Sequence, residues 1–179
     1  GMAFVLRFHL SPALAVAALG ICGVTRGWRP WADFLAGAAV PVALAALLDW
    51  ITLGLPLQSI WLNFWLNVVV GVSKGAGVSP FATLLLMPLQ IWGPIGFLLV
   101  AGAIGFGVRR LPLLLFVALV IFLTHSVVAH KEYRFIYPAI PLLAVLAGVG
   151  TSRIVQRVQE SRSLHSGGRA VLAGGLVLI

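Results

Sequence analysis

Long apolar runs alternate with short polar breaks along the whole chain. Crossing a bilayer as a helix takes roughly 20 predominantly apolar residues, and most of these runs have about that length. Because unpaired backbone groups are not tolerated in lipid, we expect the runs to be helices. The pattern predicts five spans and the start of a sixth, over residues 3–24, 32–51, 84–107, 111–129, 135–152 and from 170 onward.

Prolines and one long polar break modify this pattern. Pro88 and Pro94 interrupt the third run, which predicts that its first turns kink or lie along the membrane interface. Within the break at residues 52–80, tryptophans and asparagines each recur four positions apart, so each pair shares one helix face. The stretch "SIWLNFWLNVVV" therefore predicts an amphipathic helix that lies on the membrane surface.

The composition agrees with lipid as the main solvent of this chain. It is 61% hydrophobic and only 9% charged, whereas soluble domains carry about 25% charged residues. We therefore expect an all-α, polytopic transmembrane protein that forms a single transmembrane domain over residues 1–179. Both ends lie within apolar runs, so we also expect a fragment of a longer protein.

The basic residues indicate how the spans are oriented. The formal net charge is +8, but the arginines gather in the breaks between apolar runs, which argues against nucleic acid as a partner. Eight arginines lie in the first, third and fifth breaks, which are residues 25–31, 107–112 and 153–169. The last of these is an expected basic loop. Cytoplasmic loops carry the excess of Lys and Arg, so the second and fourth breaks are expected to face outward. These alternate breaks hold three basic residues, Lys74, Lys131 and Arg134.

Four ionisable side chains gather in the fourth break, at the mouth of the fifth span. The stretch "HKEYRF" supplies His130, Lys131, Glu132 and Arg134. Ionisable residues at membrane depth are costly and indicate a functional site, and Arg with Lys suits an anionic ligand, phosphate above all. If the stretch is helical, His130 and Arg134 share one face. The alternative interpretation is that basic and tyrosine side chains anchor a helix end at the interface, although anchoring does not require a glutamate.

A second candidate group lies between the second and third spans. Asp49, one of four acidic residues, is expected at the outer end of the second span and is followed by Asn63 and Asn67. The alternative interpretation is a structural helix at the membrane interface, where tryptophans are enriched. It explains the neighbouring tryptophans, but it explains the two asparagines less well and Asp49 hardly at all. The four histidines are scattered and no Cys/His pattern is present, so neither a metal site nor a cofactor is expected.

The stretch "HKEYRFIYPAIPLL" closely resembles the H-K-E-x-R-F-x-x-P-x-x-P-L signature of the lipid-phosphate-mannose-dependent mannosyltransferases. These enzymes of N-glycan and GPI-anchor assembly, with bacterial relatives, have the C-type glycosyltransferase fold. The residues that fall on the signature are His130, Lys131, Glu132, Arg134, Phe135, Pro138 and Pro141.

Weaker matches extend the resemblance over most of residues 4–150. They lie in "VLRFHL", in the stretch from "LDWITLGLP" to "NFWLN", and in "GVSPF". Phe81 stands where the family usually has tryptophan, and Ala76 where it often has tyrosine. The matched residues are Arg7, Asp49, Gly54, Asn63, Asn67, Gly77 and Pro80.

The resemblance implies an enzyme that transfers a mannose-like sugar from a polyprenyl-phosphate donor to a glycan or glycolipid acceptor. In the family the general base is an acidic residue in the first luminal loop, and neither Asp33 nor Asp49 matches it. We therefore expect no catalytic base in this sequence, which resembles a bacterial member without that loop. Donor-phosphate or substrate binding is expected of His130, Lys131, Glu132, Arg134, Arg7, Asp49, Asn63 and Asn67.

The expected location is a multi-pass membrane protein with its site on the periplasmic or luminal face. The Ala-, Gly- and Val-rich, lysine-poor composition favours a bacterial inner membrane, with the ER membrane as the alternative. Two other functions stay open: a transporter or flippase for a lipid-linked or anionic substrate, and a non-catalytic membrane subunit. Transporters often show inverted repeats, whereas a pair of acidic residues in an upstream outward loop would favour the enzyme.

Overall fold

The computed structural model describes residues 1–25 and 27–176, and the side chains of all of these except residues 76 and 162–176. Arg26, in the first polar break, and residues 177–179, in the expected sixth run, lie outside the described part. Every regular element in the described part is helical, so the predicted all-α class is confirmed. In chain order the elements are α1 (Met2–Leu6), η1 (Phe8–Leu10), α2 (Ser11–Cys22), α3 (Arg29–Leu53), α4 (Gln58–Phe64), η2 (Trp65–Val70), η3 (Val72–Ala76), α5 (Thr83–Gly107), α6 (Pro112–Val127), η4 (Tyr133–Phe135), η5 (Tyr137–Ala139) and α7 (Ile140–Leu176).

Three of the predicted spans are long and apolar enough to cross a membrane. They are α3, α5 and the stretch Tyr137–Ser161, which comprises η5 and the first part of α7. The first and fourth predicted spans correspond to the shorter apolar helices Phe8–Cys22 and Pro112–Val127. The polytopic membrane fold is therefore confirmed, with two helices shorter than the sequence predicted.

The first predicted span is shortened because the chain breaks at Arg7. The backbone there has φ −148° and ψ 80°, so α1 ends at Leu6 and η1 begins at Phe8. Pro12 then lies in the first turn of α2, where its missing N–H has no helical partner to lose. The break leaves Arg7 outside regular helix.

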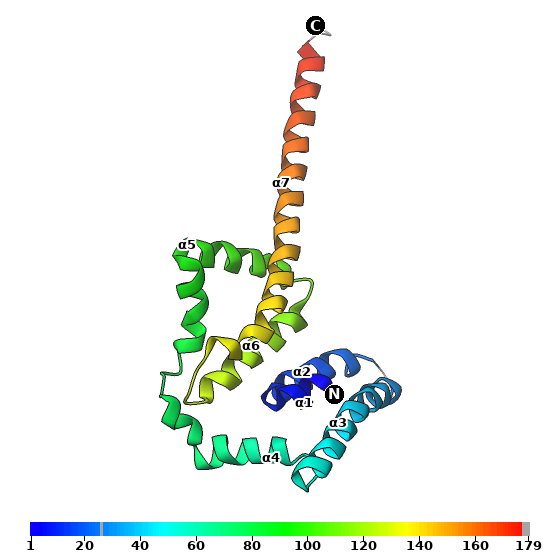
Figure 1. Ribbon diagram of the computed structural model, residues 1–179. Coiled ribbons are helices and arrows are strands. Elements are labelled where there is room, and N and C mark those ends of the chain that lie inside the picture. The colour runs from blue at the N-terminus through cyan, green and yellow to red at the C-terminus, as the bar shows by residue number, and fades with distance from the viewer. Residues whose placement is uncertain (26, 177–179) are drawn as a thin grey trace.

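α5 bends sharply between its two halves, which Figure 1 shows as two arms meeting at a corner. Gly93 has φ 67° and ψ 170°, in a region that glycine adopts without steric cost. Pro94 follows it, and a residue before proline is disfavoured in the helical conformation. The predicted kink therefore occurs at Gly93–Pro94, while Pro88 is accommodated within the first half of the helix.

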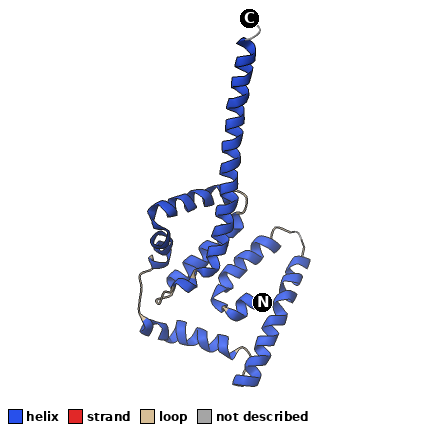
Figure 2. Ribbon diagram, turned by 45° about the horizontal axis from the view of Figure 1, so that its top comes forward, coloured by secondary structure: helices blue, strands red, loops and turns tan. Residues whose placement is uncertain are grey.

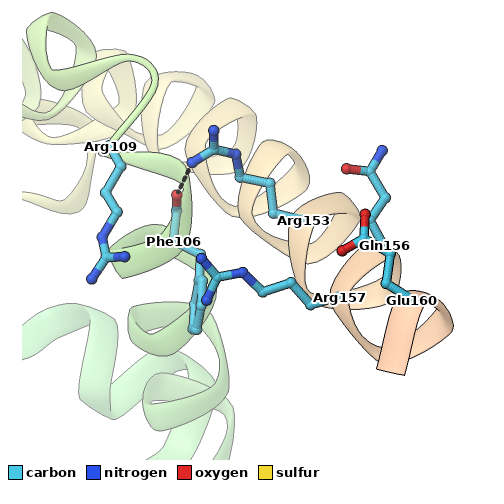
Figure 3. Close-up of a pocket in the computed structure, with 6 residues that line it drawn as sticks. All are labelled: Phe106, Arg109, Arg153, Gln156, Arg157 and Glu160. Carbon is cyan, nitrogen blue, oxygen red and sulfur yellow. Dashed lines mark hydrogen bonds between the residues drawn. The ribbon is translucent and has the colours of Figure 1, made fainter. Parts of the chain in front are cut away.

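α5 and α7 cross with their backbones in close contact. A Cβ atom at Gly150 would clash with the carbonyl oxygen of Ala103, and one at Gly107 with that of Leu146. Small residues at such crossings allow helices in membranes to pack closely. Beyond the crossing, the Arg153 side chain reaches back to the Phe106 carbonyl oxygen, as Figure 3 shows.

α7 is longer than the sequence predicted. It continues as one helix through Leu176 and includes residues 153–169, which we expected to be a loop. The four arginines and two glutamines of this segment have high helix propensity, and no proline follows Pro141, although Gly167 and Gly168 lie near its end. In Figure 2 the second part of α7 extends well away from the other helices.

The buried core is small and lies where α2, α5, α6 and η5 meet. Leu84, Ala118 and Ala139 are fully buried at its centre. Large apolar side chains elsewhere are exposed, for example Ile95 on α5 and Leu44 on α3. In water such exposure is unfavourable, but in lipid it is the expected arrangement of a membrane helix. α3, α4 and the first half of α5 run around α1, α2 and α6 (Figure 1).

Candidate functional site

The "HKEYRF" stretch lies between α6 and α7, where the chain leaves regular helix. α6 ends at Val127, Val128 and Glu132 are extended, and only Tyr133–Phe135 form a single 3₁₀ turn. The backbone N–H of Ser79 donates to the carbonyl oxygen of Ala129 at 3.0 Å. This bond places the stretch beside residues 77–80, the "GVSP" part of the sequence that the resemblance singled out.

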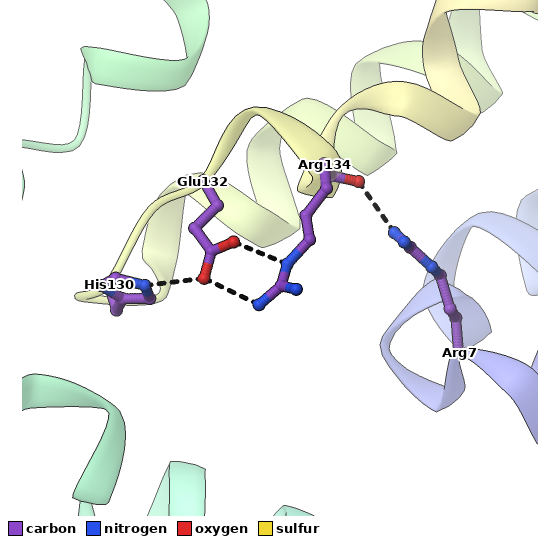
Figure 4. A network of polar contacts seen from close by, with 4 residues as sticks. All are labelled: Arg7, His130, Glu132 and Arg134. Carbon is purple, nitrogen blue, oxygen red and sulfur yellow. Dashed lines mark hydrogen bonds and ion pairs between the residues drawn. The ribbon is translucent and has the colours of Figure 1, made fainter. Parts of the chain in front are cut away.

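Glu132 is the centre of a polar network. One of its carboxylate oxygens, Oε1, lies 2.9 Å from Nε2 of His130 and accepts a hydrogen bond from Nη2 of Arg134 at 2.8 Å. The other, Oε2, lies 2.6 Å from Nε of Arg134. Figure 4 shows the carboxylate between the Arg134 guanidinium, which it contacts with both oxygens, and the His130 imidazole. Such a two-pronged ion pair fixes the orientation of the arginine as well as its position.

Arg7 joins this network from the opposite end of the chain. Its Nη1 donates to the carbonyl oxygen of Arg134 at 2.8 Å, a contact between residues 127 positions apart (Figure 4). The break in the first predicted span makes this contact possible, because the Arg7 side chain leaves from a non-helical turn. Two guanidinium groups thus lie on either side of the Arg134 backbone.

The Lys131 side chain reaches the 77–80 segment. Its Nζ donates to the carbonyl oxygens of Ser79 at 2.9 Å and Val128 at 2.8 Å. An ammonium group has three N–H donors, so one donor remains beyond these two bonds. Lys131 therefore fastens two segments together and retains the capacity to bind an anion.

The structure brings together five of the residues that the sequence suggested, but not by the helical geometry considered for them. His130 and Arg134 do not share a helix face, because the segment around Glu132 is extended with φ −133° and ψ 150°. In extended chain, residues two apart point to the same side. This geometry is consistent with the contact between His130 and Glu132, which are two residues apart. The five residues are Arg7, His130, Lys131, Glu132 and Arg134; we call them the cationic cluster.

Asp49, Asn63 and Asn67 lie apart from the cationic cluster, and no hydrogen bond or ion pair joins them to it in the described part of the chain. Asp49 is buried near the end of α3, and its Oδ2 accepts from the backbone N–H of Ser59 at 2.9 Å and from its hydroxyl at 2.6 Å. Asn67 donates through Nδ2 to Oδ1 of Asn63 at 2.9 Å. Asp49 thereby caps the first turn of α4, which carries Asn63 on its exposed surface.

Replacing Asp49 with alanine is expected to lower the free energy of unfolding in detergent by about 1–2 kcal/mol, the usual cost of losing a helix cap. The substitution removes both bonds to Ser59 and leaves its backbone N–H without the acceptor. Asp33→Ala, at an exposed position on the same helix, is the matched control and should cost much less. Equal losses in the two variants would contradict the capping role.

Two histidines that were not among the candidates extend the site toward the core. The His9 and His125 rings lie 5.6 Å apart edge to face, and His125 lies 5.8 Å from the Phe135 ring. Phe135 in turn lies 6.3 Å from His130. The position of His9, two residues after Arg7, was the available signal in the sequence. His125 is buried near the end of α6.

The network holds the pKa of the Glu132 carboxyl below its ordinary range. The hydrogen bond from His130 is the largest cause, and the positive charge and hydrogen bond of Arg134 act in the same direction. Glu132 is therefore ionised at neutral pH, and the cationic cluster contains two arginines and one lysine besides this carboxylate. The local charge is positive and suits an anion.

Lowering the pH is expected to leave the Glu132 network intact down to values below 4.5, the ordinary pKa of glutamate. Because the folded-state pKa is depressed, ionised Glu132 stabilises the folded state above that value, and this stabilisation is lost as the pH falls through the folded pKa. Infrared titration of the carboxylate band would measure the midpoint, with Glu132→Gln identifying the signal. Arg134→Gln should move the midpoint upward; a wild-type midpoint at or above 4.5 would contradict the network.

Comparison with known proteins relates the chain to a family of glycosyltransferases. A model of the Alg9-like mannosyltransferase family matches residues 26–179, which include every residue of the cationic cluster except Arg7. No curated protein and no solved structure matches the chain.

Proposed function

The chain belongs to the Alg9-like mannosyltransferase family, and from this premise we propose that it moves a mannose-like sugar from a polyprenyl-phosphate donor to a glycan or glycolipid acceptor. Membership of the family confirms the resemblance found in the sequence and makes the chain a membrane glycosyltransferase. It also favours an enzyme over a transporter or a non-catalytic subunit. We further propose that the site lies on the non-cytoplasmic face of the membrane.

The single observation that carries the donor assignment is the cationic cluster. Glu132 holds Arg134 through Nε and Nη2, while Nη1 of Arg134 has no hydrogen-bond partner in the described part of the chain. The Arg134 side chain is also 62% exposed. An oriented, accessible guanidinium, three residues along the chain from a lysine that keeps one unused donor, is suited to a phosphate group.

The position of the cluster explains why the donor would be a lipid. The cluster lies between the end of α6 and the start of the apolar stretch Tyr137–Ser161. A polyprenyl tail stays in the hydrocarbon region, so its phosphate emerges at a helix end of this kind. A soluble nucleotide sugar would gain nothing from the surrounding apolar helices.

The proposed reaction is a direct displacement with inversion. The acceptor hydroxyl oxygen forms a bond to the anomeric carbon of the sugar while the bond from that carbon to the phosphate oxygen breaks. The bonding electrons leave with the phosphate, and the hydroxyl proton passes to a general base, which the family resemblance places in a luminal loop outside these residues. Arg134 and Lys131 stabilise the negative charge that grows on the phosphate.

The remaining members of the cationic cluster position these two cations. Glu132 orients Arg134 and His130, and Arg7 holds the Arg134 backbone. Lys131 is placed by its bonds to Ser79 and Val128. We assign His130 and Arg7 to assisting roles, because His130 bonds to Glu132 and Arg7 bonds to the backbone of Arg134.

The acceptor is proposed to contact the exposed side of α4 and η2. Asn63 and Asn67 present amide groups there, and amides both donate to and accept from sugar hydroxyls. Asp49 contributes indirectly by capping α4 and fixing its position against α3. The indole rings of Trp61 and Trp65 are largely exposed on the same segment, as expected at a membrane interface.

Photoaffinity labelling tests the donor assignment. A photoreactive polyprenyl phosphate is expected to label the full-length protein in membranes within residues 128–139, because the phosphate holds the lipid at the cationic cluster. An excess of unlabelled polyprenyl phosphate should suppress the labelling. The matched control is polyprenol, which has the same tail without phosphate and should compete far more weakly. Equal competition by polyprenol, or labelling confined to other helices, would contradict a phosphate site in this segment.

A further inference from the structure

A second basic site lies at the far side of the α5–α7 crossing from the cationic cluster. It is a shallow hollow of about 210 Å³ between the end of α5 and the middle of α7. Neither the donor nor the acceptor role uses it. The lining residues, shown in Figure 3, are Phe106, Arg109, Arg153, Gln156, Arg157 and Glu160.

Phe106 orients two of the arginines. Arg153 donates through Nη1 to the Phe106 carbonyl oxygen at 3.5 Å, a long bond, and the Arg157 guanidinium lies over the Phe106 ring at 5.5 Å. Arg109 approaches from the other side of Phe106 (Figure 3). Guanidinium groups that are already directed by a ring and a carbonyl lose less freedom when they bind a ligand.

The charge of the hollow selects an anion. Three arginines and one carboxylate, that of Glu160, line the hollow, so two positive charges are in excess among the lining residues. Like charges that line one hollow repel one another, and a bound anion relieves this repulsion. The guanidinium fork matches the oxygens of a phosphate group, and Gln156 adds an amide donor.

The location indicates that the phosphate belongs to a lipid. The hollow lies where α5 ends at Gly107 and beside the polar continuation of the apolar stretch Tyr137–Ser161. The stretch Tyr137–Ser161 is long enough to cross a membrane, so its polar end is expected to meet the headgroup layer. The arginine distribution assigns this end to the cytoplasmic face, whose leaflet carries anionic lipids.

We propose that Arg109, Arg153 and Arg157 form a binding site for the phosphate of an anionic lipid headgroup at the α5–α7 junction. The bound headgroup bridges the two helices from the outside, just beyond the Gly107 and Gly150 contact. The site is separate from the sugar-transfer site, and its existence does not depend on which donor the enzyme uses.

Lipid binding to the full-length protein tests this site. The protein would be reconstituted in phosphatidylcholine membranes with increasing phosphatidylglycerol, and the retained lipid would be counted by native mass spectrometry. Arg157→Gln is expected to weaken phosphatidylglycerol binding roughly tenfold, since a charge-assisted pair is lost. Arg157→Lys, which keeps the charge but not the fork, should lose less. Arg29→Gln removes an exposed arginine from the same expected face outside the hollow and should leave binding unchanged.

The outcomes separate this site from simpler explanations. Equal weakening in Arg157→Gln and Arg29→Gln would overturn the proposal, because it would reduce the effect to general attraction between a basic surface and an anionic membrane. Displacement of phosphatidylglycerol by inorganic phosphate at comparable concentration would also overturn it, in favour of a site for the free ion. Unfolding in phosphatidylcholine alone should be alike for wild type and Arg157→Gln, which shows that the variant is folded.

Discussion

Replacing Arg134 with alanine is expected to lower kcat for sugar transfer about a hundredfold or more, the effect of removing one preorganised group that stabilises charge in a transition state. The donor KM should change by only a few-fold, because the guanidinium contact strengthens as negative charge grows on the departing phosphate. Glu132 holds the guanidinium in one orientation before the donor binds, so little reorganisation accompanies the reaction. The measurement is steady-state transfer by the full-length protein in membranes.

Two variants make this result interpretable. Arg110→Ala removes an exposed arginine at the opposite end of the spanning helices and should leave kcat unchanged. Arg134→Lys keeps the charge, but a lysine has a single nitrogen and cannot form the two-nitrogen ion pair with Glu132. Its kcat is expected to lie between those of wild type and Arg134→Ala. An Arg134→Ala enzyme with weakened donor binding and normal turnover would contradict the transition-state role. Lys131→Ala should also slow transfer, but it additionally releases Ser79, so its effect has two causes.

Replacing Gly150 with alanine is expected to lower the free energy of unfolding by about 1–3 kcal/mol, as overpacking does. The added Cβ atom would clash with the backbone carbonyl of Ala103, and a backbone atom cannot rotate aside as a flexible side chain can. α5 and α7 would have to separate at their closest point. Denaturant unfolding of the protein in detergent would measure the loss.

Gly148→Ala is the matched control for this substitution. Gly148 lies on the same helix two residues away, and nothing lies within 4 Å of a Cβ atom built there. Alanine in an unobstructed helical position stabilises by up to about 1 kcal/mol relative to glycine. The two variants should therefore shift stability in opposite directions. A Gly150→Ala protein as stable as Gly148→Ala would contradict the close crossing of α5 and α7.

The lengths of the apolar runs predicted the long helices, because a helix needs about 20 apolar residues to cross the bilayer. α3 and α5 begin and end within a few residues of the predicted runs, and Gly93–Pro94 supplies the predicted kink. The sequence does not predict the helical continuation of α7 through residues 153–169, because polar composition is also typical of a loop, although the arginines and glutamines there favour helix. The break at Arg7 was also missed, since an apolar run shows no sign of where a single residue leaves the helix.

The sequence predicted which residues form the candidate site better than it predicted how they are arranged. The motif pointed to His130, Glu132 and Arg134, and all three lie in one network. The helical spacing considered for them was wrong, because an extended segment, not a helix, connects α6 to η4. The contact of Lys131 with Ser79 joins residues 52 positions apart. No local pattern in the sequence encodes such a contact; only the packing of α5 against α6 and α7 creates it.

The central claim is that this membrane glycosyltransferase takes its sugar from a polyprenyl-phosphate donor bound at the cationic cluster. The most direct test is transfer of radiolabelled mannose by the full-length protein in membranes, supplied either as polyprenyl-phosphate-mannose or as a nucleotide-linked mannose. We predict transfer to a glycan or glycolipid acceptor from the lipid-linked donor and none from the nucleotide-linked donor. Transfer from the nucleotide-linked donor alone, or no transfer from polyprenyl-phosphate-mannose, would contradict the account.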